Sequence, residues 1–399
     1  MRDKQQSPEC ILTNVQAVLP DRVQSGACVR IAGDRIAGIR EMEAIPGAKI
    51  AGGAVAVDFA GDYMVPGLID LHVHGCGGAD TMDGTPAALV HMAKALLRQG
   101  TTAFLATTMT AGADRLREVL GVGADWPETG MQAEFLGFHL EGPCISSEYR
   151  GAQKPVAESA ITNIIALYDR RVKIVTLAPE LADADACLAA AIKKGIIVAA
   201  GHSGASFDEM RQAIDAGVRH LTHAFNAMPG IHHRKPGLLT AALLDPRVSI
   251  ELIADGVHIH PSVLELALRL KGLEQVILVS DGTRAVGMPD GDYDLGGQQV
   301  SLSQGRLTLP DGTIAGSAAP LLAGVRFMVR AVGRGLPEAV RMASLNPARA
   351  LGVDSDHGSL RAGALANFLR LSPELELKEV WMRGRRVIDA ASAARERNE

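Results

Sequence analysis

Short apolar runs alternate with amphipathic stretches along most of the chain. We read eight of these runs as β-strands: 67–73, 103–108, 134–140, 172–177, 196–200, 220–225, 248–254 and 276–281. Most of them are apolar along their whole length, as is typical of parallel strands that are covered on both faces. The pattern therefore predicts a buried parallel sheet.

Helical patterns separate these strands. The clearest covers residues 86–99, with Pro86 near its start and Gly100 beyond its end. One face of it carries the apolar residues Leu89, Met92, Ala93, Leu96 and Leu97. Eight strand–helix alternations in about 280 residues favour a (β/α)₈ barrel of the TIM type over an open doubly wound sheet.

The two ends of the chain have a different pattern. Short β-like pieces at 11–18, 28–32, 35–39 and 55–59 are separated by Gly, Asp and Pro, and similar pieces return at 367–371 and 379–382. We predict that residues 1–63 and 355–399 pair into one small β-sandwich domain beside a barrel at 64–354.

Residues 282–315 interrupt the barrel pattern between its eighth strand and the helix that follows. This segment is rich in Gly and Asp, with short alternating pieces. We interpret it as an inserted hairpin and loop, at a position where barrels carry functional lids.

Composition narrows the class of protein. The chain of 399 residues is 47% hydrophobic and 21% charged, as is ordinary for a soluble globular protein. A net charge of −5 and 4% aromatic residues argue against a nucleic-acid or anionic-membrane partner. The polar N-terminus lacks the apolar core expected of a signal peptide, and no apolar run approaches the roughly 20 residues of a membrane span. Five widely spaced cysteines suit free thiols in a reducing cytoplasm.

Candidate metal ligands fall at the ends of the predicted strands. With 12 histidines in the chain, one His-x-His pair is weak evidence, and a lone His at a strand end is usually structural. All strand ends of a barrel, however, meet at one mouth. Six side chains end or follow five different strands: His72, His74, Glu141, His202, His223 and Asp281. Such a set predicts a site for Zn²⁺, Fe²⁺ or Mn²⁺.

Four further residues allow more than one interpretation. We expect His258 to point into the mouth as a substrate contact, and His260 to be a surface or capping residue. Cys76 and Cys144 follow the metal motifs, so they are soft ligands, oxidation-sensitive thiols or small packing groups, of which we favour the last.

Six segments together resemble the N-acetylglucosamine-6-phosphate deacetylases of the amidohydrolase superfamily: "PGLIDLHVHG", "GFHLEGP", "GHSGA", "LTHAFNAMPGIHHRKPG", "ADGVHIHP" and "VSDGT". The likeness covers nearly the whole chain. It implies metal-dependent hydrolysis of a phosphorylated N-acetyl amino sugar to the amine and acetate, in amino-sugar catabolism.

The resemblance also implies roles for the candidate ligands. Glu141, His202 and His223 hold one ion, while Glu141 bridges to a second that His72 and His74 help to bind. We expect two ions, Zn²⁺ or Fe²⁺ before Mn²⁺, Co²⁺ or Ni²⁺. A bound ion lowers the pKa of its water to about 7.

Asp281 is the expected catalytic residue. Its carboxylate would accept the proton of the attacking water and return it to the amine, which leaves poorly until it is protonated.

The resemblance assigns the sugar phosphate to Asn226, the backbone at Ala227, Arg234 and His258. A guanidinium suits phosphate because it donates two parallel hydrogen bonds. In this family the arginine typically comes from a neighbouring subunit, so a homodimer is implied. The alternative for Arg234 is a solvated loop residue.

The chain departs from the family at two places. Ala152 and Gln153 stand where the family has a stretch such as "GAHNP", so a histidine that contacts substrate is replaced. The loop 315–322 also differs, and Ala319, Pro320 and Leu321 would face the sugar and acetyl group. The preferred substrate therefore stays open between N-acetylglucosamine 6-phosphate and N-acetylgalactosamine 6-phosphate or another N-acyl amine. A non-catalytic relative is disfavoured because all six chemical residues are present.

Overall fold

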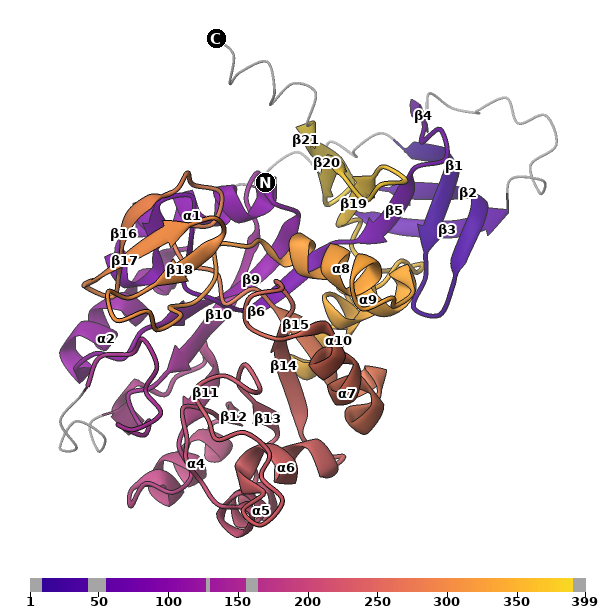
Figure 1. Ribbon diagram of the computed structural model, residues 1–399. Helices are drawn as coiled ribbons and strands as arrows, with labels where there is room; N and C mark the ends of the chain where they lie inside the picture. Colours follow the sequence, from indigo (N-terminus) through magenta and orange to yellow (C-terminus); the bar gives the residue numbers. More distant parts are fainter. Residues whose placement is uncertain (1–8, 42–54, 127–129, 156–163, 390–399) are drawn as a thin grey trace.

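The computed structural model describes residues 9–41, 55–126, 130–155 and 164–389. Its centre is a nearly closed barrel of eight parallel strands, which follow one another around the barrel in chain order (Figure 1). They are β6 (Leu68–Val73), β9 (Thr101–Thr108), β10 (Glu134–Glu141), β11 (Val172–Leu177), β12 (Ile197–Ala200), β13 (His220–Leu221), β14 (Ser249–Ile253) and β15 (Val276–Val279). A parallel bridge between Val73 and Gly282 joins the end of the first strand to the loop that follows the last. The predicted TIM-type barrel is confirmed.

Helices cover the outside of the barrel (Figure 1). They are α1 (Pro86–Arg98), α2 (Ala113–Gly121), α4 (Ala184–Lys193), α5 (Phe207–Ala216), α6 (Gly237–Leu244), α7 (Pro261–Lys271), α8 (Leu321–Arg330), α9 (Leu336–Met342) and α10 (Leu345–Ala350). α1 begins where the sequence predicts, because the Thr85 hydroxyl accepts a hydrogen bond from the Ala88 amide and Pro86 occupies the first turn. Gly100, at φ 91°, follows its end. No helix in the described part of the chain has the length and apolar character needed to cross a bilayer.

Two barrel strands end earlier than the apolar runs predict. The predicted strands 220–225 and 276–281 stop at Leu221 and Val279. Beyond these points His223 and Asp281 have positive φ values of 28° and 49°, which an extended ladder does not tolerate. The two side chains therefore lie in the loops at the mouth, just past the strands.

The barrel interior is apolar at its base. One buried cluster joins Ile69 and Leu71 of β6 with Ile174 of β11 and Ile253 of β14, and it includes Ala348 of α10. Strands on different sides of a closed sheet share a cluster only through its interior. This layer supports the polar residues of the mouth.

The chain ends form a second sheet, separate from the barrel (Figure 1). Its strands are β21 (Arg385–Asp389), β20 (Leu377–Met382), β19 (Phe368–Leu371), β5 (Tyr63–Pro66), β1 (Cys10–Val18), β2 (Val23–Ala32) and β3 (Arg35–Glu41), with β4 (Val55–Asp58) beside β1. Antiparallel pairing of β5 with β19 joins the two ends. Its own core contains Leu12, Ile36, Phe368 and Trp381. The predicted domain formed by both ends is thereby confirmed in its architecture. The boundaries at 63/64 and 354/355 stay predictions, and the first of them falls within β5.

The inserted segment is a three-stranded antiparallel sheet where we expected a hairpin and loop. It consists of β16 (Gly291–Leu295), β17 (Gln298–Ser303) and β18 (Arg306–Thr308). Leu295, Val300 and Leu302 pack with Met109, which follows β9 at the mouth. The remaining strands, β7 (Gly75–Cys76) and β8 (Ala79–Asp80), form a short hairpin after β6.

Candidate metal centre and active site

Glu141, His202 and His223 meet at the mouth of the barrel. The Oε1 atom of Glu141 lies 3.0 Å from Nε2 of His223 and 3.2 Å from Nε2 of His202, and these two nitrogens are 3.1 Å apart. If both rings donated to Oε1, two N–H groups would face each other at that distance. Ligands about 2.0–2.1 Å from a tetrahedral ion are spaced similarly, at about 3.3–3.4 Å. The trio fits a divalent cation better than a hydrogen-bonded cluster.

His72 and His74 form a second group around the same carboxylate. Their Nε2 atoms are 3.4 Å apart, and they lie 3.3 Å from Oε1 and 3.4 Å from Oε2 of Glu141, respectively. Oδ1 of Asp281 is 3.4 Å from His72 and 3.2 Å from His74. Glu141 is shared by both groups of potential ligands, so its position suits a bridging carboxylate.

The charge balance at the mouth also favours cations. Burial alone would raise the pKa values of Glu141, Glu251 and Asp281, but the facing histidines hold all three below their usual range. Burial alone would lower the pKa of His72, and these carboxylates raise it well above its ordinary value. Three buried carboxylates require compensation by positive charge, which divalent ions supply without protonating the ligands.

Glu251 of β14 is a functional candidate that sequence reasoning missed. Its Oε2 lies 3.0 Å from Nδ1 of His72, and its Oε1 lies 2.9 Å from Nε2 of His220. It also accepts a hydrogen bond from the backbone amide of His223. A carboxylate behind a metal-binding histidine fixes the orientation of the ring. The signal in the sequence was a charged residue inside an otherwise apolar strand.

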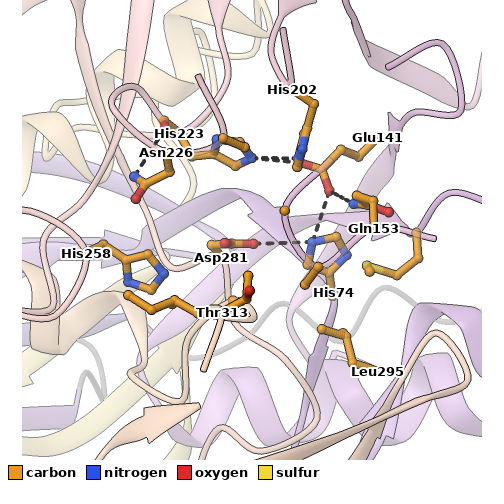
Figure 2. A pocket seen from close by; sticks show the side chains of 16 residues that line it. His74, Glu141, Gln153, His202, His223, Asn226, His258, Asp281, Leu295 and Thr313 are labelled. Atoms are coloured by element: carbon orange, nitrogen blue, oxygen red, sulfur yellow. Dashed lines mark hydrogen bonds and ion pairs between the residues drawn. The ribbon is translucent and has the colours of Figure 1, made fainter. Parts of the chain in front are cut away.

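A cavity of about 250 Å³ opens in front of these residues. Figure 2 shows Asp281 and His74 between two groups of lining residues, with Gln153 on one side and Asn226 and His258 on the other. Of the predicted substrate residues, five line the cavity: Ala152, Gln153, Asn226, Ala227 and His258. Six lining residues were missed by sequence reasoning: Met109, Gly151, Leu295, Thr313, Ile314 and Gly316. Leu295, Thr313 and Ile314 lie within the inserted segment, so that segment forms part of the cavity wall.

The side chain of His258 is set up to interact with an anion. Its Nδ1 lies 2.7 Å from Oδ2 of Asp255. Burial alone would lower the pKa of His258, but the Asp255 carboxylate raises it above the ordinary value. The ring is therefore held as a cation over a wider pH range, which suits a phosphate. The other histidine of this pair, His260, accepts a hydrogen bond from the Ser262 amide at the start of α7, which confirms its capping role.

Four other predicted substrate residues are placed elsewhere. Among the described residues, the lining of the cavity does not include Arg234, Ala319, Pro320 or Leu321. Arg234 is exposed, and its Nη1 lies 2.7 Å from Nε2 of His233. Pro320 precedes α8 and borders a separate cavity beside α1, so only Gly316 of that loop reaches the site.

The two cysteines near the metal motifs are buried away from the ligands. Sγ of Cys76 lies 3.8 Å from the Val286 carbonyl oxygen, and burial raises the pKa of this thiol to about 12. Sγ of Cys144 lies 3.6 Å from that of Cys187. Neither is part of a potential metal-binding group in the described structure, as the packing interpretation requires.

Comparisons with known proteins bear on the family and the fold. The model of the amidohydrolase family matches residues 63–387. An N-acetylglucosamine-6-phosphate deacetylase of Vibrio furnissii is 38% identical over 84% of this chain and 85% of its own. An N-acetylgalactosamine-6-phosphate deacetylase of Escherichia coli O157:H7 is 37% identical over 81% of this chain and 87% of its own.

A solved structure gives the same result for the fold. It is an aspartate-to-alanine mutant of N-acetyl-D-glucosamine-6-phosphate deacetylase from Mycobacterium smegmatis in complex with N-acetyl-D-glucosamine-6-phosphate. It superposes with a TM-score of 0.86 at 32% identity, covering 96% of this chain and 100% of that one.

Proposed function

Because the chain belongs to the amidohydrolase family, we propose that it hydrolyses N-acetylglucosamine 6-phosphate to glucosamine 6-phosphate and acetate. The observation that carries the proposal is the cluster of Glu141, His202 and His223, which lines the same cavity as Asp281. Deacetylases of this substrate match the chain over more than four-fifths of its length.

The residues divide the chemistry between them. A divalent ion held by Glu141, His202 and His223 would polarise the acyl carbonyl and make water a stronger nucleophile at neutral pH. Asp281 accepts the proton of the attacking water and returns it to the amine nitrogen. We propose Zn²⁺ or Fe²⁺ as the ion, and a second ion at His72 and His74.

The anionic end of the substrate binds on the side of Asn226 and His258. In our proposal the backbone at Ala227 donates to the phosphate, and Arg234 reaches it from the neighbouring subunit of a homodimer. Two features support the dimer. Arg234 points to solvent within its own chain, and Ile231 in the same loop is 50% exposed.

Arg234→Ala is expected to raise KM for the phosphorylated substrate about 10–100-fold, because a charge-assisted hydrogen bond contributes about 1.5–3 kcal/mol. The dimer is tested by co-expressing differently tagged Arg234→Ala and Asp281→Asn subunits and isolating the mixed dimer. One of its two sites has both Asp281 and a donated Arg234, so about half of wild-type activity at low substrate is expected. A mixed dimer no more active than its parents would place Arg234 in its own site, or outside both.

The identity of the sugar is tested by acetate release from a panel of N-acetyl hexosamines with and without 6-phosphate. We expect the highest kcat/KM for N-acetylglucosamine 6-phosphate and a large loss without the phosphate. Preference for N-acetylgalactosamine 6-phosphate would favour the second candidate function, deacetylation of that sugar. It is supported by the N-acetylgalactosamine-6-phosphate deacetylase of Escherichia coli O157:H7, which is 37% identical to this chain. No acetate from any panel member would refute both.

We further propose that the enzyme works in the cytoplasm. Its five cysteines are free and buried, as is usual for proteins of a reducing compartment.

A further inference from the structure

Gln153 lies where the family resemblance predicts a substrate contact, but its amide is directed at a metal ligand. The residue follows β10 and is 3% exposed. Its Nε2 donates a hydrogen bond to Oε2 of Glu141, and its Oε1 accepts one from the Thr110 backbone amide at 2.7 Å. Figure 2 shows it beside Glu141.

The orientation of this amide is fixed by its partners. A backbone N–H only donates, so the atom that faces Thr110 must be the oxygen of the Gln153 amide. The NH₂ group is then turned towards Glu141, whose ionised carboxylate only accepts. A histidine at this position offers no carbonyl oxygen, so it cannot reproduce both contacts in the same way.

The loop that carries Gln153 is itself held in place. The backbone N–H of Gln153 donates to the Arg150 carbonyl at 2.9 Å. The Ala152 carbonyl accepts from Nε2 of Gln298 in β17 at 2.5 Å. The inserted sheet therefore anchors the loop on one side, and Thr110 anchors the side chain on the other.

This arrangement separates the two oxygens of Glu141. Oε2 receives the side-chain amide of Gln153 and lies 3.4 Å from Nε2 of His74, while Oε1 faces the Nε2 atoms of His202 and His223. Without the amide, Oε2 loses its neutral hydrogen-bond donor, so the direction of Oε1 is held less firmly. Partners that orient a ligand in this way typically contribute 10–100-fold to metal affinity.

We propose that Gln153 is a positioning residue that holds Glu141 in the orientation its metal site needs, and that it does not bind the sugar. The inference rests on the proposed function only in taking Glu141, His202 and His223 as metal ligands. Gln153, at which the chain departs from the family pattern, then acts on the metal site. It lies on the side of the cavity away from Asn226 and His258 (Figure 2).

The test is Gln153→Met, which keeps the length of the side chain and removes its hydrogen bonds. The Kd for Zn²⁺ is measured by competition with a chromogenic chelator, without substrate, and KM and kcat are measured at saturating Zn²⁺. For Gln153→Met we expect the Kd of the more tightly bound Zn²⁺ to rise about 10–100-fold. KM should change by less than about twofold.

A Kd for Zn²⁺ within about threefold of the wild-type value would overturn the inference. If KM were raised while this Kd stayed unchanged, Gln153 would be a substrate-binding residue. Gln299→Met, the same change at an exposed glutamine of β17, is the control and should leave Kd unchanged. If Gln153→Met fails to fold, Gln153→Asn is used, because it keeps the amide but cannot span both partners. Absence of acetate release by the wild type would refute the proposed function and leave the Zn²⁺ comparison intact.

Discussion

Asp281→Asn is expected to lower kcat for N-acetylglucosamine 6-phosphate by about 10²–10⁴-fold, the usual contribution of a positioned general base and acid. Asparagine has nearly the same shape, so the backbone at this position, with φ 49°, is kept. Its amide, however, cannot take the proton from water or return it to the leaving amine. The carboxylate is ready for this role because the nearby histidines hold its pKa below the usual value against the effect of burial.

The measurement is initial-rate acetate release by metal-replete protein, with metal content determined on the same samples. Metal content matters because Oδ1 of Asp281 also lies 3.2 Å from Nε2 of His74, a proposed metal ligand. Loss of metal from the variant would lower kcat as well, so the two causes must be separated. Asp114→Asn, at a carboxylate that is 96% exposed, is the matched control and should retain full activity. Near-wild-type turnover by Asp281→Asn, or a loss that excess metal restores, would remove Asp281 from the catalytic role.

Glu251→Leu is expected to lower the free energy of unfolding by about 3–5 kcal/mol, the range for removal of one partner from a buried charged network. Glu251 is fully buried and accepts from His72, His220 and the His223 backbone. Leucine fills much of the space but satisfies none of these donors, so two imidazoles lose their buried partner.

The change is measured by urea unfolding of the metal-free protein, so that altered metal binding does not contribute. Glu118→Leu is the control, because this carboxylate is 66% exposed and its ion pair with Arg115 should contribute less than about 1 kcal/mol. A loss for Glu251→Leu no larger than that of the control would show that the network does not stabilise the fold.

The sequence predicted the barrel, and the candidate site residues at its mouth, because both follow local rules. Apolar runs mark strands, and residues just past strand ends meet at one mouth whatever the detailed packing. This reasoning predicted that His202, His223 and Asp281 lie at the mouth, although all three have positive φ values beyond their strands, which no hydrophobic pattern reveals.

Other parts of the site depend on contacts between segments far apart in the chain. Glu251 bonds to His72 across 179 positions of sequence, so its strand looked like any buried strand with one charge. The inserted segment places Leu295 and Thr313 in the cavity wall, a result of how this segment folds back on the mouth. The family resemblance similarly predicted that the loop of Pro320 faces the sugar and acetyl group, but only Gly316 of that loop lines the cavity.

In our proposal the mouth of the barrel hydrolyses the amide with the help of a bound divalent ion. The most direct test is acetate release from N-acetylglucosamine 6-phosphate by chelator-treated protein as Zn²⁺ or Fe²⁺ is added back. We expect almost no acetate from the metal-free protein, and activity that rises with the ion and saturates at one or two equivalents per subunit. Full activity in the metal-free protein, or no acetate at any metal loading, would contradict the account.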